Sequence, residues 1–209
     1  MRESQIRAWV EALTNSFGKA RVSAGDEPFR ALHAVGDYTA MAALIKEQLR
    51  LGTKMRLGRV KSSGFAQKVC WADRPNDMPM YGSPVFHDTV VTLYIKESFL
   101  KRAPHGAVVV AMAHEMSRVI LDAIRHSLRD RAEAADLAAM LLGYRDFFVN
   151  DAFYEKAARC PDNPTTAHGD MPNFSFFEDL FAGFGFSGQP VAGYLTREER
   201  EYAALLMRD

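Results

Sequence analysis

The amino-acid sequence predicts a mainly helical α+β domain, and three observations carry this prediction. Apolar residues recur every three or four positions in several long segments, which is typical of amphipathic helices. One short run, residues 89–95, concentrates β-branched and aromatic residues as a strand does. A length of 209 residues, with 48% hydrophobic and 25% charged residues, suits a single domain with a sizeable core.

The N-terminal half is expected to hold two helices followed by the strands. Helical spacing predicts a first helix over residues 6–17. A second helix begins after Asp37, a good N-cap, and is expected to end at Gly52. Strands are then expected at 54–60 and 68–71, followed by turns at 75–79 and 81–84. The strongest strand signal is at 89–95.

The C-terminal half is expected to be helical apart from one long loop. Pro104 suits the first turn of a long helix that ends near residues 125–126. A second helix is predicted over 131–148, and Thr196 with Glu199 forms a capping box for a last one. We therefore expect one domain over 1–209, which divides into an N-terminal helical extension at 1–36, an irregular Phe-rich loop at 160–193 and a C-terminal helix at 194–209.

Composition narrows the function classes. The 26 basic and 26 acidic side chains give a formal net charge of zero, which argues against a nucleic-acid binder. The sequence shows neither a signal-peptide core nor an apolar run long enough to span a membrane. Cys70 and Cys160 make no metal knuckle and no disulfide framework, so we expect reduced thiols in a cytoplasmic protein.

The most informative motif is His114-Glu115-Met116-Ser117-Arg118, within the long helix. In the HExxH signature of zinc peptidases, two histidines four residues apart bind one metal, and the glutamate is the general base. Here Arg118 holds the position of the second histidine, and a guanidinium has no lone pair for a metal. The motif alone is weak, because His-Glu pairs on helices also occur by chance.

The wider sequence resembles a soluble bacterial group of gluzincin-like metallopeptidase domains, related to the prenyl-protein endopeptidases but without their membrane helices. The resemblance spans residues 37–206, and the segments that carry it are YGS (81–83), VVTLYI (90–95), SFL (98–100), VVAMAHEMS (109–117), DLAAMLLGY (136–144) and GYLTREE (193–199). It implies a zincin-like core, in which a small sheet lies beside the active-site helix and a ligand-bearing helix follows. It also implies that the 89–95 strand is the sheet edge that an extended substrate joins.

The resemblance assigns roles residue by residue. His114 matches the first zinc ligand, Glu115 the general base, and Asp136 the carboxylate that orients the histidine. Arg118 and Ala132 fall on the two remaining ligand positions and cannot bind zinc, while Glu133 is one residue too late, about 100° around the helix. We therefore expect no cofactor, and zinc only if other ligands complete the site.

Two questions about the site stay open in the sequence. Other ligands are conceivable, although none has ligand-pair spacing: His87, His105, Asp122, His126, His168 and Asp170. Arg118 either occupies the place of the metal and pairs with Glu115 or Asp136, or reaches solvent.

The leading prediction is a catalytically degenerate metallopeptidase homologue that acts as a binding or regulatory module, with a protein or peptide partner. An active zinc endopeptidase with non-standard ligands is the first alternative. A structural subunit is the second; it would dock through an aromatic segment that carries Phe174, Phe176, Phe177, Phe181, Phe184 and Phe186.

Overall fold

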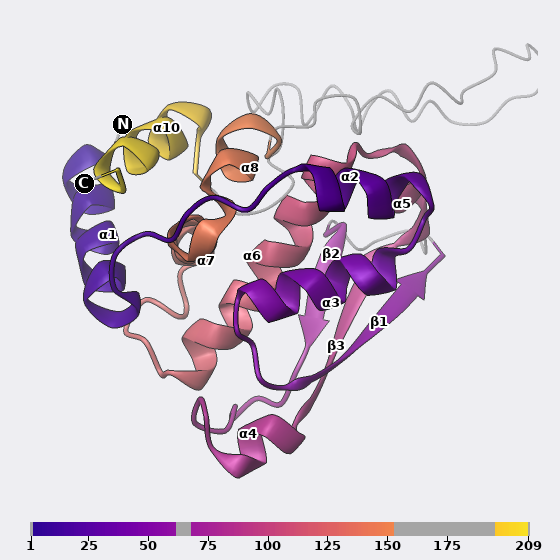
Figure 1. The fold of residues 1–209 in the computed structure, drawn as a ribbon. Helices are drawn as coiled ribbons and strands as arrows, with labels where there is room; N and C mark the ends of the chain where they lie inside the picture. Colours follow the sequence, from indigo (N-terminus) through magenta and orange to yellow (C-terminus); the bar gives the residue numbers. More distant parts are fainter. Residues whose placement is uncertain (1, 62–67, 153–194, 209) are drawn as a thin grey trace, which may run out of the picture.

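The computed structural model describes residues 2–61, 68–152 and 195–208. It has the mixed, mainly helical α+β architecture that the sequence predicts (Figure 1). Helix α6 passes through the middle of the molecule, with the sheet on one side and α1, α7, α8 and α10 on the other. The helices are α1 (Glu3–Phe17), α2 (Glu27–Ala34), α3 (Tyr38–Gln48), α4 (Pro84–Asp88), α5 (Glu97–Arg102), α6 (His105–Ala123), α7 (Ala132–Ala139), η1 (Met140–Tyr144), α8 (Arg145–Asn150) and α10 (Arg197–Leu206).

The sheet has three strands in the order β1-β3-β2. Strand β1 (Lys54–Val60) runs parallel to β3 (Val90–Lys96), and β2 (Cys70–Asp73) runs antiparallel to β3 on its other side. The prediction of a strand near 89–95 is confirmed, but its expected place at the sheet edge is wrong. The edge strand that packs against α6 is β2, whose four residues gave a weak signal, whereas the apolar side chains of β3 mark a central strand.

Helix α6 is buried from Gly106 to Ala123 except at Arg118 and Asp122. Pro104 was expected in the first turn and is the N-cap, one residue earlier, where its fixed φ is tolerated and its missing N–H needs no partner. A helix that is apolar nearly all round belongs in a core. Charged or ionisable side chains that it carries inward, His114 and Glu115, therefore need partners there.

The predicted helix over 131–148 is wrong as one continuous element. It divides into α7, the π-helical segment η1 and α8, and the break lies at Gly143, whose φ is +113°. A Cβ at Gly143 would also lie 3.0 Å from the Val22 carbonyl oxygen. The chain at residues 21–24 crosses this break, because Arg21 N–H donates to the Leu141 carbonyl at 2.8 Å and Ala24 N–H to the Gly143 carbonyl at 2.7 Å. The carbonyl groups at this break therefore accept hydrogen bonds from the crossing segment at 21–24. Helical periodicity in the sequence does not reveal such a contact.

Helix α3 begins as predicted, with the Asp37 side chain accepting from Ala40 N–H at 2.9 Å. Its expected end at Gly52 is wrong. Arg50 takes the left-handed position with φ +56°, and the bonds Leu51 N–H to Lys46 O and Arg50 N–H to Glu47 O form a Schellman motif. Helix α6 ends in the same way at Arg125, with φ +52°. These are the two non-glycine residues with positive φ in the part of the chain that the structure describes.

The capping box predicted for the last helix is confirmed, since Thr196 and Glu199 exchange both hydrogen bonds at the start of α10. Helix α10 lies beside α1, whose Ile6, Trp9, Val10 and Leu13 are buried. Short helices α2, α4 and α5 were not anticipated, and α4 takes up part of the expected turn at 81–84. The predicted Phe-rich loop lies outside the described residues.

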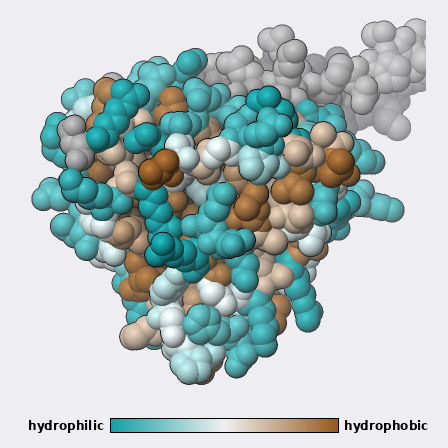
Figure 2. Space-filling view, in the orientation of Figure 1, coloured by the Kyte–Doolittle hydropathy of each residue, from teal (hydrophilic) through white to brown (hydrophobic). Residues whose placement is uncertain are grey.

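Hydrophilic residues cover most of the face shown in Figure 2, with smaller hydrophobic patches between them. None of the helices described is both long and apolar enough to cross a bilayer.

Candidate functional site

The candidate site is a set of charged side chains around the middle of α6, which we call the His114 centre. It consists of His114, Glu115 and Arg118 from α6, Asp136 from α7 and Arg200 from α10. His114 and Glu115 are 5% and 3% exposed, and Asp136 and Arg200 are fully buried. Three helices therefore bring two carboxylates, two guanidinium groups and one imidazole together, and of these Arg118 alone is partly exposed.

Asp136 connects His114 to Arg200. The Nδ1 atom of His114 lies 2.7 Å from Asp136 Oδ1, and Arg200 Nη2 donates to Asp136 Oδ2 at 3.1 Å. Because a carboxylate only accepts, Nδ1 carries a proton, and Nε2 is the ring atom that has a lone pair to offer when the imidazole is neutral. This is the orientation that a carboxylate gives to a metal-binding histidine.

Arg200 was not anticipated as a member of the site. It is 64 residues from Asp136 in sequence, and its guanidinium carbon lies 5.8 Å from the centre of the Phe148 ring. A cation at full burial needs a counter-charge, and Asp136 supplies one. The only sequence signal was the spacing of Arg200 with Ala203 and Ala204, which places it on the same side of a short helix as these apolar residues.

Both carboxylate oxygens of Glu115 are engaged. Oε2 accepts from the Ala72 backbone N–H at 3.2 Å, and Oε1 lies 3.5 Å from Arg118 Nη1 and 3.9 Å from His114 Nε2. The Arg118 side chain is 25% exposed, so it lies mostly along the protein and partly at the surface. Arg118 pairs with Glu115, whereas Asp136 is served by Arg200.

The Ala72 contact places Glu115 against the free edge of the sheet. Lys96 N–H donates to Val69 O, so in β2 the backbone groups of residues 69, 71 and 73 face β3 and those of Ala72 face away. Glu115 therefore occupies an N–H that an added strand would use. In an edge-binding peptidase that N–H would be offered to the substrate backbone; here a side chain of the central helix holds it.

Among the residues that the structure describes, the side chains around His114 do not fit a zinc ion. His114 Nε2 is one available ligand atom, while Arg118 and Ala132 supply none at the other two positions. Catalytic zinc takes three protein ligands and a water. Glu133, one residue after Ala132, is engaged elsewhere through an ion pair of 3.1 Å with Arg2. In the described ranges, no three His, Cys, Asp or Glu side chains are grouped so that they can hold a metal.

The other candidate ligands that the structure describes have partners of their own, away from His114. Asp122 pairs with Arg74, and His105 pairs with Asp26. His87 contacts the Gly52 carbonyl at 3.2 Å, and His126 accepts from Leu128 N–H at 3.0 Å. His168 and Asp170 lie outside the described residues.

Cys70 lies at the start of β2 and is buried. Burial, and then the neighbouring Glu115 carboxylate, raise the pKa of the Cys70 thiol well above its ordinary value. A thiol of this kind is a poor nucleophile, because the reactive form is the thiolate. Cys70 therefore adds no nucleophile to the His114 centre.

No family model, curated protein or solved structure matches this chain significantly. The likeness to gluzincin-like domains rests on the motifs in the sequence.

Proposed function

We propose that this chain is a catalytically degenerate homologue of the zinc metallopeptidases, a cytoplasmic binding or regulatory module on a zincin-like core. In this proposal the His114 centre keeps the histidine, the glutamate and the orienting aspartate of a peptidase site. An internal cation, Arg118, replaces the metal as the partner of Glu115.

The observation that carries the proposal is the state of Glu115. A general base in a zinc peptidase must reach a metal-bound water with a free carboxylate oxygen. Here one oxygen accepts from Ala72 N–H at 3.2 Å, and the other lies 3.5 Å from Arg118. With both oxygens held and no second ligand at Arg118, the water-activating step has no starting geometry. This supports a role in binding rather than hydrolysis.

Elemental analysis of the purified protein, prepared without a metal-binding tag, tests the metal side of the proposal. We expect much less than one zinc per chain, and the same content in His114→Ala. About one zinc per chain, lost in His114→Ala, would contradict the proposal and favour an active endopeptidase completed by ligands such as His168 or Asp170.

A peptidase assay on an unfolded protein substrate tests the activity side. We expect the wild type to cleave no faster than Glu115→Gln, because without a metal the water keeps its high pKa. Cleavage by the wild type that Glu115→Gln abolishes would refute the degenerate assignment.

A further inference from the structure

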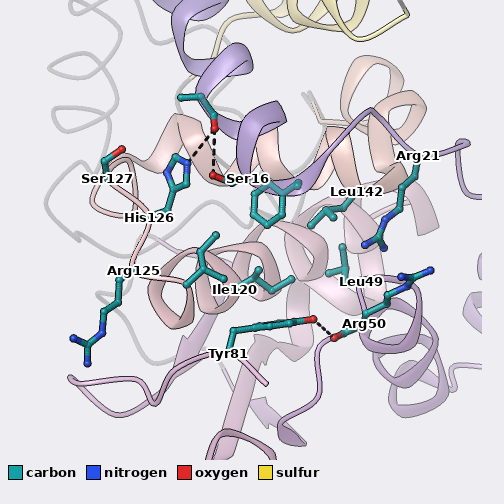
Figure 3. Close-up of a pocket in the computed structure, with 13 residues that line it drawn as sticks. Ser16, Arg21, Leu49, Arg50, Tyr81, Ile120, Arg125, His126, Ser127 and Leu142 are labelled. Atoms are coloured by element: carbon teal, nitrogen blue, oxygen red, sulfur yellow. Dashed lines mark hydrogen bonds between the residues drawn. The ribbon is translucent and has the colours of Figure 1, made fainter. Parts of the chain in front are cut away.

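A cavity of about 850 Å³ lies away from the His114 centre, at the C-terminal end of α6 (Figure 3). Its walls come from α1, the crossing segment at 21–24, the end of α3, Tyr81, the end of α6 and η1. None of the charged residues of the His114 centre lines it. We call it the arginine cavity, after Arg21 and Arg50.

Arg21 and Arg50 place two cations on one side of the cavity, with their guanidinium groups next to each other (Figure 3). Burial, and then repulsion from Arg50, lower the pKa of Arg21 below its ordinary value. Arg21 Nη1 donates to the Gln48 carbonyl at 2.8 Å, which is a neutral partner. The cavity lining includes no carboxylate, and no ion pair joins Arg21 or Arg50 to an acid among the described residues. The site therefore has positive charge to offer to an anion.

The backbone holds both arginines in place, and at Arg50 it does so in a strained conformation. The backbone of Arg21 is fixed by the hydrogen bond from its N–H to the Leu141 carbonyl. Leu141 lies in the π-helical segment η1, whose carbonyl groups accept from the crossing segment at 21–24. Arg50 adopts a left-handed backbone that glycine would accept more readily, and Tyr81 donates its hydroxyl hydrogen to the Arg50 carbonyl. Residues in such strained positions cluster at ligand sites. An arginine at a position that favours glycine therefore points to a role for its side chain.

Arg125 provides the contrast. It has the same Schellman position at the end of α6 and also lines the cavity, but its side chain points away from the interior (Figure 3). Its Nη2 lies 3.5 Å from Asp77 Oδ1. Left-handed arginine at a helix end is therefore compatible with an outward, paired side chain. Arg50 is exposed as well, but its guanidinium faces that of Arg21 (Figure 3).

The rest of the wall is divided by polarity. Apolar side chains from four segments form its middle: Phe17, Leu49, Ile120, Ile124 and Leu142. Ser16, His126 and Ser127 lie on the side opposite the two arginines (Figure 3). Ligand sites commonly combine an apolar body of this kind with a few convergent polar groups.

We propose that the arginine cavity binds a small organic anion with an apolar body, either a carboxylate or a phosphate monoester. The guanidinium groups of Arg21 and Arg50 hold the anionic head, because a planar guanidinium can donate two parallel hydrogen bonds to a carboxylate or to a phosphate. The apolar middle of the cavity, with Phe17, Ile120 and Leu142, takes the hydrocarbon part. The proposal is independent of the state of the His114 centre.

Calorimetric titration of the full-length chain with octanoate, octyl phosphate and 1-octanol tests this. We expect at least one of the two anions to bind in a saturable manner and the neutral alcohol to bind at least about tenfold more weakly, because a charge-assisted contact contributes more than one factor of ten. Whichever anion binds more tightly identifies the head group. Failure of both anions to bind, or equal binding of 1-octanol, would overturn the proposal.

Two variants in the same backbone position provide the matched comparison. Arg50→Gly removes the cation and supplies the residue that the left-handed backbone favours, so the fold is retained. We expect anion binding to weaken about tenfold or more in Arg50→Gly and to stay within about twofold of wild type in Arg125→Gly. Equal losses in the two variants, or no loss in Arg50→Gly, would contradict the assignment of Arg50 to the anionic head.

Discussion

The His114 centre and the arginine cavity treat charge in opposite ways. In the first, each carboxylate has a cation or a backbone N–H beside it: Asp136 has Arg200 and His114, and Glu115 has Arg118 and Ala72. In the second, Arg21 and Arg50 face each other without an acid among the lining residues. Buried charge that is internally paired stabilises a fold or fixes its geometry, whereas converging unpaired charge is available to a ligand.

This difference reverses what the motifs suggest. The helix that resembles a peptidase site carries the internally satisfied charges, and a region without any motif carries the available ones. Sequence resemblance locates residues that match a catalytic arrangement, whereas charge pairing indicates where a ligand can bind. The predictions below test this difference, beginning with the largest effect.

Asp136→Ala should be the most destabilising of these changes. It removes a carboxylate from Arg200, which is fully buried, and the acceptor from His114 Nδ1–H. Removing one partner of a buried pair costs about 3–5 kcal/mol, because the other charge stays buried. Urea denaturation midpoints measure it. Glu201→Ala, which breaks an exposed pair with Arg197 on the same helix α10, is the control and should change stability by about 0.5 kcal/mol or less. Similar losses in the two variants would show that the buried pair is no more important than a surface one.

Arg118→Ala should have an intermediate effect. Its side chain is 25% exposed, and Glu115 keeps the bond from Ala72 N–H, so the cost is expected at about 1–2 kcal/mol rather than the full value for a buried pair. A double-mutant cycle with Glu115→Gln isolates the interaction. A coupling energy near zero would mean that Arg118 serves only the surface and does not replace a metal as the partner of Glu115.

Arg50→Gly should leave stability unchanged or raise it slightly. The substitution removes a cation that repels Arg21 and relieves a left-handed backbone, so we expect a change of no more than about 1 kcal/mol in the stabilising direction. The change in stability is measured by thermal unfolding of Arg50→Gly and wild type under the same conditions. A clear loss of stability would show that Arg50 is paired internally, which would remove the contrast between the two regions.

The sequence predicts the regular elements better than their ends and junctions. Residues 54–60, the long helix after Pro104 and the capping box at Thr196 were recognisable, because their signals are local: alternation, a fixed φ and a hydrogen-bonding pair. The break at Gly143 was missed, because it depends on a chain segment that crosses it more than a hundred residues away in sequence. Arg50 was missed as a helix end for a similar reason, since Gly52 is the residue that local preference selects.

In the candidate site, too, the residues with local sequence signals were predicted and those placed by tertiary packing were not. Helical spacing was enough to bring His114, Glu115 and Arg118 to one region, and the motif that resembles a gluzincin selected Asp136 on the next helix. Arg200 and the Ala72 N–H come from elements that only tertiary packing places there. The arginine cavity has no sequence signal, because its walls come from six separate segments of the chain.

The most direct test of the central claim compares the zinc affinity of the wild type with that of the double variant Arg118→His with Ala132→Glu. The variant restores two ligand types beside His114, whose Nδ1 is already held by Asp136 at 2.7 Å. Competition titration against a zinc-binding dye measures both proteins, with far-UV circular dichroism to establish that the variant is folded. We expect the wild type to show no tight zinc binding and the variant to bind about one zinc per chain. Tight zinc binding by the wild type that depends on His114 would contradict the assignment of this centre as a metal site closed by an internal cation.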